Sequence, residues 1–294
     1  MSIQTAPAGT GLAGQPATTA GTSQPRGVNL LVLPATLLLL LVFVVPAILM
    51  LAYSVTEPPA GLHHLHEALT APLTRTILLR SVTVAAEVTV LSLLLGLPFA
   101  MIAAETSAKY RAVLLGAIGC TLFFSVIVRA YAWLALLGTN GPVTDALHAL
   151  HLGSTTGYAH TRVGTIIAMV QYGVPYMVLA IYDSVRRIDP QLPKAASVNG
   201  ASAFNTFRWV RLPLMLPGIA AGSIIVFVTT LGYYVIPQVV GSPTDMMIGQ
   251  LISQQINQAT NWGLGAALAT LLILVSLACF GIFRMLTRLE NRLS

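Results

Sequence analysis

Residues 194–217 read KAASVNGASAFNTFRWVRLPLMLP, a half-polar segment in a chain that otherwise consists mostly of apolar runs. Pro193 suits the first turn of a helix, which Lys194 continues and which Gly200 can end. Beyond this glycine, apolar residues recur at helical spacing, and Trp209, flanked by arginines, is typical of an anchor in the membrane interface. The segment therefore predicts a short helix under a membrane and a second one in the interface. It would serve either to dock a cytosolic partner or as a plain amphipathic connector.

The composition of the whole chain is that of a membrane protein. Hydrophobic residues make up 55% of its 294 residues and charged residues only 8%, whereas soluble domains carry about 25% charged residues. The net charge of +6 would indicate a nucleic-acid partner in a soluble chain. Here the basic residues lie between and beside apolar runs, which suits membrane topology better. Cys120 and Cys279 both fall inside apolar runs, so we interpret them as packing residues rather than as a disulfide.

Six apolar runs are long enough to cross a bilayer, whose core of ~30 Å takes about 20 helical residues. They lie at about 28–53, 80–104, 112–137, 163–183, 217–236 and 264–286. The sequence therefore predicts an all-α membrane protein with six transmembrane helices. Residues 1–27 are rich in Ala, Gly, Thr, Ser, Pro and Gln, which predicts a disordered tail.

Small residues recur at every fourth position in two of these runs. They are Ser92, Gly96, Ala100 and Ala104 in the second run, and Gly218 and Gly222 at the start of the fifth. Such stripes let helices approach closely in lipid. We therefore expect these residues to lie at contacts between helices.

Lysine and arginine residues set the predicted orientation. With the N-terminus in the cytoplasm, eleven of the fifteen fall on the cytoplasmic side, only Arg75, Arg80 and Arg162 fall outside, and Arg129 lies within the third run. Both termini are therefore expected in the cytoplasm, and the loop at about 184–216 is the longest cytoplasmic connection. Arg129 is expected to extend to the membrane interface or to brace a subunit interface rather than to bind a solute.

The opening stretch resembles the cytoplasmic-loop signature of ABC importer permeases, in which Glu-Ala-Ala is followed by three residues, glycine, nine residues and Ile-x-Leu-Pro. Here Ala195-Ala196, Gly200 and Val210-Arg211-Leu212-Pro213 have this spacing. The resemblance implies that the loop forms a coupling helix that inserts into a groove of an ATPase subunit. Lys194 stands where the family usually has Glu, which reverses a charge at this contact. The implied coupling residues are Lys194, Ala195, Ala196, Gly200, Ala201 and Phe204.

Three further stretches resemble the spermidine/putrescine-type members of these permeases. They are LLRSVTVAAEVTVLSLLLGLPFAMIAA (78–104), SVIVRAYAWLALLGTNGPVTDAL (125–147) and GYYVIPQVVGSPTDMMIGQLISQQINQATNWGLGAALA (232–269). The resemblance covers roughly residues 28–290. It implies a permease domain over that range with the type I importer (MetI-like) architecture, in the bacterial inner membrane.

The resemblance also implies how such a subunit works. It would take a small polar solute, a polyamine or a related amine or opine, from a periplasmic or extracellular solute-binding protein. The other implied partners are a pair of ATPase subunits, which would bind the ATP and Mg²⁺, and a second, homologous permease subunit. No cofactor is expected in this chain, because no Walker A pattern GxxxxGK[ST] occurs in it.

Polar groups at membrane depth are costly and indicate function. Glu87 is the carboxylate that the sequence places well inside a span, where it could attract a cationic solute. Tyr172 and Tyr176 share a helix face, and aromatic faces suit ammonium groups, although tyrosines also populate ordinary interface belts. The predicted solute pathway comprises Glu87, Gln171, Tyr172, Tyr176, Tyr233 and Tyr234.

Other functions find less support. A secondary transporter driven by an ion gradient, the main alternative, would predict inverted repeats and paired intramembrane charges. An intramembrane enzyme would need a nucleophile and a base at matching depth. The sequence shows neither pattern. His63, His64 and His66 with Glu67 form a group for which metal binding is possible, but a solvated external loop is the preferred interpretation, so no metal site is expected.

Overall fold

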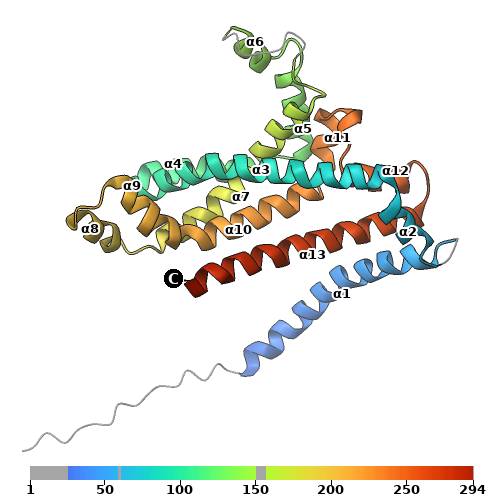
Figure 1. Ribbon diagram of the computed structural model, residues 1–294, viewed down its shortest axis with the longest axis horizontal. Coiled ribbons are helices and arrows are strands. Elements are labelled where there is room, and N and C mark those ends of the chain that lie inside the picture. Colours follow the sequence, from blue (N-terminus) through green and yellow to red (C-terminus); the bar gives the residue numbers. More distant parts are fainter. Residues whose placement is uncertain (1–25, 59–60, 150–156, 294) are drawn as a thin grey trace, which may run out of the picture. The chain divides into compact units, whose positions relative to one another are not determined.

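The computed structural model describes residues 26–58, 61–149 and 157–293, and these residues form thirteen α-helices (Figure 1). The helices are α1 (Arg26–Thr56), α2 (His63–Thr70), α3 (Pro72–Glu105), α4 (Ala108–Phe123), α5 (Val126–Leu137), α6 (Pro142–Ala149), α7 (Arg162–Arg186), α8 (Gln191–Val198), α9 (Ala203–Thr206), α10 (Leu212–Leu231), α11 (Val235–Val240), α12 (Ile248–Asn257) and α13 (Trp262–Leu293). A π-helical turn, Phe207–Arg211, joins α9 to α10, and a 3₁₀ turn, Pro243–Asp245, precedes α12.

By its internal contacts the chain divides into residues 1–48 and 49–294. The described part of the first unit is the beginning of α1, an apolar helix that contains Pro34 and Pro46. Residues 1–25 of the predicted tail lie outside the described residues, and the last two residues of that predicted tail, 26 and 27, belong to α1. The other helices all belong to the second unit.

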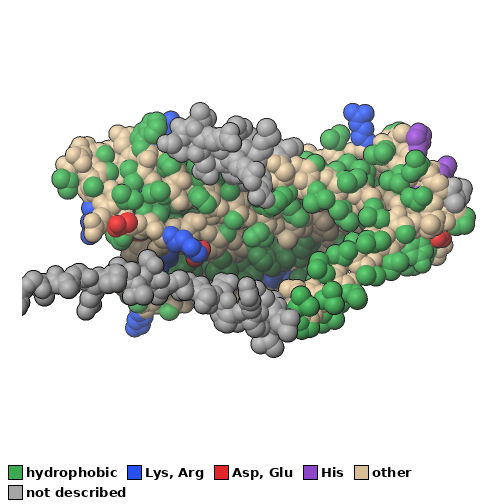
Figure 2. Space-filling model, turned by 90° about the horizontal axis from the view of Figure 1, so that it is seen from below, with side chains coloured by type: hydrophobic (Ala, Val, Ile, Leu, Met, Phe, Trp, Pro, Cys, Tyr) green, Lys and Arg blue, Asp and Glu red, His purple; other side chains and the backbone are tan. Residues whose placement is uncertain are grey.

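Within the described residues, five helices are long and apolar enough to span a membrane, or six if one bent pair counts as a single span. The five segments are Leu33–Thr56, Pro72–Glu105, Arg162–Arg186, Ala203–Leu231 and Trp262–Gly281, and the bent pair consists of α4 and the segment Val126–Ala146, which begins with α5. Hydrophobic side chains make up much of the visible surface in Figure 2, as expected of helices that face lipid. The predicted all-α membrane fold is therefore confirmed.

Two predicted spans are wrong in detail. The third, at 112–137, is not one helix, because the backbone is not helical at Phe124 and Ser125, and α4 meets the segment Val126–Ala146, which begins with α5, at an angle of 102°. The fifth, at 217–236, is shifted, because α10 ends at Leu231 and residues 232–234 are not helical. Both differences arise where a continuous apolar run conceals a break in the helix.

Helices α3, α7 and α10 lie side by side at the centre of the second unit (Figure 1). Met177 of α7 is fully buried between the other two helices. A Cβ atom at Gly96 of α3 would lie 2.9 Å from Cγ of Met177, and one at Gly222 of α10 would lie 2.8 Å from its Sδ. Likewise, a Cβ atom at Gly173 of α7 would lie 2.7 Å from Oγ of Ser92 on α3. The predicted stripes of small residues are therefore confirmed as helix contacts.

A second apolar cluster joins α2, α3, α12 and α13, with Ala68, Ile77, Ile248, Leu251, Ala267 and Leu268 buried in it. The expectation of a solvated loop at His63, His64 and His66 is wrong for this reason. The segment is a helix, and His64 is only 4% exposed because the ring packs against α13. His63 and His66 do face solvent, and histidine side chains are visible at the α2 end of the molecule in Figure 2.

Arg129 of α5 fills the angle between α4 and α5. Its guanidinium donates to the carbonyl oxygens of Thr121 and, at 3.5 Å, Phe124, and its Cζ lies 5.5 Å from the centroid of the Tyr172 ring. The residue is only 8% exposed, so Arg129 braces this bend within the chain, while its position at the membrane interface or at a subunit interface stays a prediction. Carbonyls at the end of a helix have no intrahelical partner, and Arg129 satisfies two of them.

We predict that Arg129→Met destabilises the protein by about 2 kcal/mol, because it leaves the partly buried Thr121 carbonyl without this donor. The midpoint of thermal unfolding in detergent should fall by roughly 5 °C. Arg75→Met is the matched control, since Arg75 is exposed at the beginning of α3. An unchanged midpoint for Arg129→Met would show that the angle between α4 and α5 does not depend on this side chain.

Candidate functional site

The polar loop begins with α8, whose end is fixed by Gly200. The Gly200 N–H donates to the carbonyl of Ser197 at 3.1 Å, and the Ala201 N–H donates to the carbonyl of Ala196 at 3.0 Å. These two bonds form a Schellman motif, which needs a left-handed residue, and Gly200 has φ +82°. The predicted end of the helix at this glycine is confirmed. A Cβ atom there would meet nothing within 4 Å, so within this chain the backbone conformation, and not crowding, requires glycine.

The loop presents its side chains to the surroundings. No residue of α8 is buried, and Lys194 and Ala195 are exposed. Val198 at the end of α8 is 87% exposed, and Phe204 on α9 is 67% exposed. Ser202 begins α9 by accepting a hydrogen bond from the Asn205 N–H at 3.2 Å. Large apolar side chains that are exposed on a polar loop are typical of a surface that a partner covers.

An ion pair connects this loop to the membrane helices. Arg211, in the π-helical turn before α10, donates to Glu105 at the end of α3. A cleft beside the pair is lined by Met101, Arg186 and Pro193, among others. The ends of α3 and α7 and the beginning of α8 therefore line one cleft beside this ion pair. The sequence analysis did not find this pair, because its two residues are 106 positions apart.

Three of the predicted pathway tyrosines lie together. The hydroxyls of Tyr172 and Tyr176 are 3.3 Å apart, and the centroids of the Tyr172 and Tyr233 rings are 4.8 Å apart. Tyr233 reaches this position because α10 ends at Leu231 and the chain turns back there. All three rings are partly buried in the larger apolar core. We call Tyr172, Tyr176 and Tyr233 the tyrosine cluster.

Helix α5 contacts the cluster and its neighbour on α7. Arg129 lies over the Tyr172 ring, and the indole Nε1 of Trp133 donates to Oε1 of Gln171 at 3.4 Å. Gln171 lines a largely apolar groove between α3, α4 and α7. Tyr234 is 40% exposed and makes no ring contact with the cluster among the described residues. The structure thus groups Gln171 near the cluster and separates Tyr234 from it.

Glu87 lies elsewhere. Its Oε1 accepts from the guanidinium of Arg162 at 2.6 Å, and the two side chains are 38% and 41% exposed. Arg162 is the first residue of α7, so Glu87 is level with the end of that helix. Glu87 lies within the candidate span Pro72–Glu105, and its place well inside a span stays a prediction. Its charge is also already paired.

Comparisons with known proteins agree with this architecture. The family model described as "Binding-protein-dependent transport system inner membrane component" matches residues 92–294. The chain is 34% identical over 224 residues to the inner membrane ABC transporter permease protein YdcU of Escherichia coli. This match covers 71% of each of the two chains. It is also 30% identical over 222 residues to the spermidine/putrescine transport system permease protein PotB of the same organism. This match covers 75% of this chain and 81% of PotB.

A solved structure has the same fold. The structure of a bacterial alginate ABC transporter in complex with an alginate-pentasaccharide-bound periplasmic protein contains a chain that matches with a TM-score of 0.69. The two chains are 19% identical, and the match covers 89% of this chain and 94% of the other. The predicted MetI-like architecture and the resemblance to spermidine/putrescine-type permeases are both confirmed.

The ion pair at the loop gives a test. Arg211→Glu should loosen residues 191–211, because it places two carboxylates together where a pair stood. An ion pair of this exposure contributes up to about 1 kcal/mol, so we expect chymotrypsin to cleave after Phe204 and Trp209 up to about fivefold faster. Proteolysis of the purified protein, followed by mass spectrometry, measures this rate.

The double variant Arg211→Glu/Glu105→Arg is the control. It restores opposite charges at the same two positions and should return cleavage to the original rate. If it is cleaved as fast as the single variant, the pair does not hold the loop.

Proposed function

Since the chain belongs to the binding-protein-dependent transport system inner membrane components, we propose that it is the membrane-spanning permease subunit of an ATP-driven importer. We further propose that this importer carries a polyamine or a related amine. The observation that carries the proposal is the exposed loop of α8 and α9, which has the signature spacing of importer permeases and is connected by an ion pair to α3. The name of the similar PotB supports the solute class.

ATP and Mg²⁺ would be bound by a separate pair of ATPase subunits. The exposed side chains of Val198 and Phe204 would enter a groove on one of them, with Lys194, Ala195, Ala196, Gly200 and Ala201 around the contact. Closure of the ATPases would draw α8 inward. Because Arg211 connects the loop to the end of α3, this movement would reach the central helices.

The remaining partners follow from the family. Six spans are too few to enclose a path alone, so a second, homologous permease subunit would complete it. A periplasmic or extracellular solute-binding protein would deliver the solute; the similar alginate transporter was solved with such a periplasmic protein. The bias of basic residues supports cytoplasmic termini in a bacterial inner membrane.

The tyrosine cluster is the proposed contact with the solute. The faces of aromatic rings attract ammonium groups, and three rings from two parts of the chain meet here. Gln171 beside them offers an amide. Glu87, at the end of α7, would attract a cation toward the entrance instead of holding it at mid-depth. We place Tyr234 outside the contact, at the rim.

Arg129 favours a second candidate solute. It carries a positive charge beside Tyr172, and its second terminal nitrogen is buried with no hydrogen-bond partner among the described residues. A fully cationic polyamine would be repelled there. An amine that also carries a carboxylate, such as an opine, would pair with the free nitrogen. Uptake of spermidine measured against uptake of an opine distinguishes the two.

Purification of the complex tests the proposed function. The chain, tagged and extracted gently from its native membrane, should carry an ATPase and a second permease subunit, identified by mass spectrometry. A chain that purifies alone, and that transports without ATP when reconstituted, would be a secondary transporter.

The same purification tests the docking loop. Phe204→Asp should lower the yield of ATPase at least tenfold, because it puts a charge on an apolar contact. Asn205→Asp is the matched control, since it adds the same charge to the neighbouring exposed residue of α9. Equal losses in both variants would mean that added charge, and not the Phe204 contact, weakens the complex.

Uptake tests the tyrosine cluster. Tyr172→Leu should raise the KM of amine uptake about 2–30-fold, because it removes one cation–π contact, whereas Tyr172→Phe keeps the ring and should change it little. Tyr234→Leu, which removes an exposed ring outside the cluster, is the control. A KM for Tyr172→Leu that equals the control value would remove the cluster from the solute path.

A further inference from the structure

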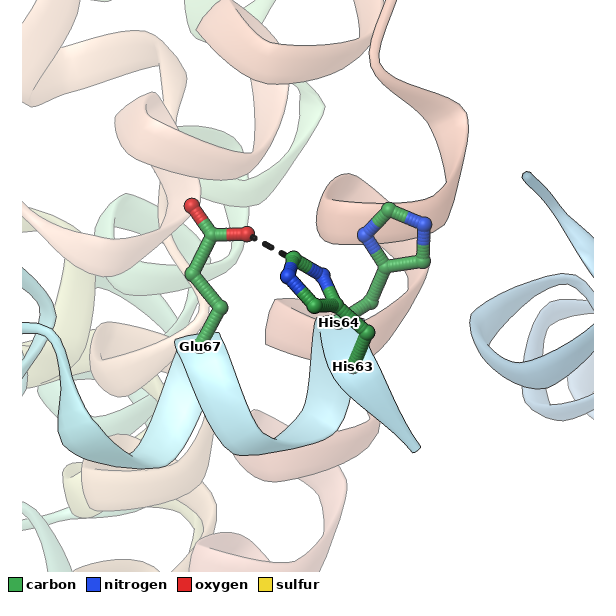
Figure 3. Close-up of side chains that lie close together, drawn as sticks. All are labelled: His63, His64 and Glu67. Atoms are coloured by element: carbon green, nitrogen blue, oxygen red, sulfur yellow. Dashed lines mark ion pairs between the residues drawn. The ribbon is translucent and has the colours of Figure 1, made fainter. Parts of the chain in front are cut away.

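Three side chains with metal-binding atoms lie together on α2, away from the tyrosine cluster and the coupling loop. His63, His64 and Glu67 place their ligand atoms within 4.8 Å of one another (Figure 3). His63 and Glu67 are four residues apart on one helix face, and Nδ1 of His63 is 4.0 Å from Oε2 of Glu67. Their side chains are 63% and 45% exposed, so both are free to change rotamer.

His64 is different, because its ring is buried and lacks a partner. The residue is 4% exposed, and neither ring nitrogen has a hydrogen-bond partner among the described residues. Its Nε2 lies against Gly263, where a Cβ atom would be only 2.5 Å away. In Figure 3 the ring stands on the same side of α2 as the imidazole of His63 and the carboxylate of Glu67, with a nitrogen turned toward them.

A buried imidazole with no partner is unfavourable, since a group taken from water normally finds a hydrogen bond or a ligand. Here another imidazole and a carboxylate each place a ligand atom within 4.8 Å of it. Two histidines and a carboxylate form a common ligand set for zinc, whereas calcium and magnesium prefer oxygen ligands. The buried, unpartnered ring of His64 therefore indicates a bound ligand. The exposed side chains of His63 and Glu67 alone would not indicate one.

We propose that His63, His64 and Glu67 bind one Zn²⁺ ion, with water in the remaining position. Ligands of a tetrahedral zinc at 2.0–2.2 Å lie about 3.4 Å apart, so the cluster needs to contract from its present spacing. The exposed side chains of His63 and Glu67 can make this movement, while His64 stays fixed by Gly263. Both imidazoles bind in the neutral form, so zinc affinity falls in acid.

Zinc at this position would strengthen one contact of the fold. His64 rests on Gly263 near the beginning of α13, and Ala68 on the same helix packs into the cluster that contains Ala267. A metal that holds the His64 ring would fix α2 against α13. The site therefore predicts a zinc-dependent gain in stability that does not depend on transport.

The test uses the full chain, purified without a histidine tag, stripped with a chelator and dialysed against micromolar ZnCl₂. We expect one zinc per chain by elemental mass spectrometry and a higher midpoint of thermal unfolding with zinc than without it. His63→Ala and Glu67→Gln should each lower zinc affinity at least tenfold. Both residues are largely exposed, so these variants keep the fold, which the midpoint without zinc verifies.

His66→Ala is the matched control, because His66 is exposed on the same helix but does not belong to the cluster. It should retain the zinc and the gain in stability. The proposal is overturned if the parent protein retains no zinc, or if His66→Ala loses as much zinc as His63→Ala. Neither result bears on the importer function, which rests on the coupling loop.

Discussion

Apolar helices in a bilayer gain little by packing on one another, because lipid tails are equally apolar, so their association depends on how closely their surfaces fit. In this chain the surfaces of α3, α7 and α10 fit together around the side chain of Met177. Glycines from α3 and α10 face this side chain from two directions, and a methyl group at Gly96 or Gly222 would lie under 3 Å from it. The position of α7 between the other two helices follows from this contact. Tyr176 directly precedes Met177 and Tyr172 lies five residues before it on the same helix, so this contact also fixes the part of α7 that carries the two tyrosines.

Backbone hydrogen bonding in an apolar surrounding is the second constraint, and it explains how the candidate site is built. Every carbonyl freed at a helix break must find a donor. The break between α4 and α5 is closed by Arg129, which is thereby held over Tyr172. The break after α10 turns Tyr233 back toward the same ring. The two helix breaks thus bring Arg129 and Tyr233 to the same ring, that of Tyr172.

The sequence was sufficient for features that depend on local chemistry. The long apolar runs predicted most of the spans, and Gly200 predicted the end of α8, because a left-handed residue after a helix favours glycine. The sequence was insufficient wherever a contact with a residue far along the chain determines the local structure or the burial of a side chain. The run at 112–137 has nothing at Phe124 and Ser125 that forbids a helix; the break there is satisfied by Arg129. Likewise, the burial of His64 depends on Gly263, which lies about 200 residues further along the chain.

The depth of Glu87 can be argued from α3 itself. Glu87 pairs with the first residue of α7, and Glu105 pairs with Arg211 just before α10. Glu105 follows Glu87 by eighteen positions in the same helix, a rise of about 27 Å at 1.5 Å per residue. The hydrocarbon core of a bilayer is ~30 Å thick. The spacing of the two ion pairs is close to this thickness, so we expect them to lie near the two boundaries of the apolar layer, where charged groups remain in contact with water. Between them α3 carries no charged residue, so in the proposed function a solute at mid-depth would meet the tyrosine cluster and not a fixed carboxylate of α3.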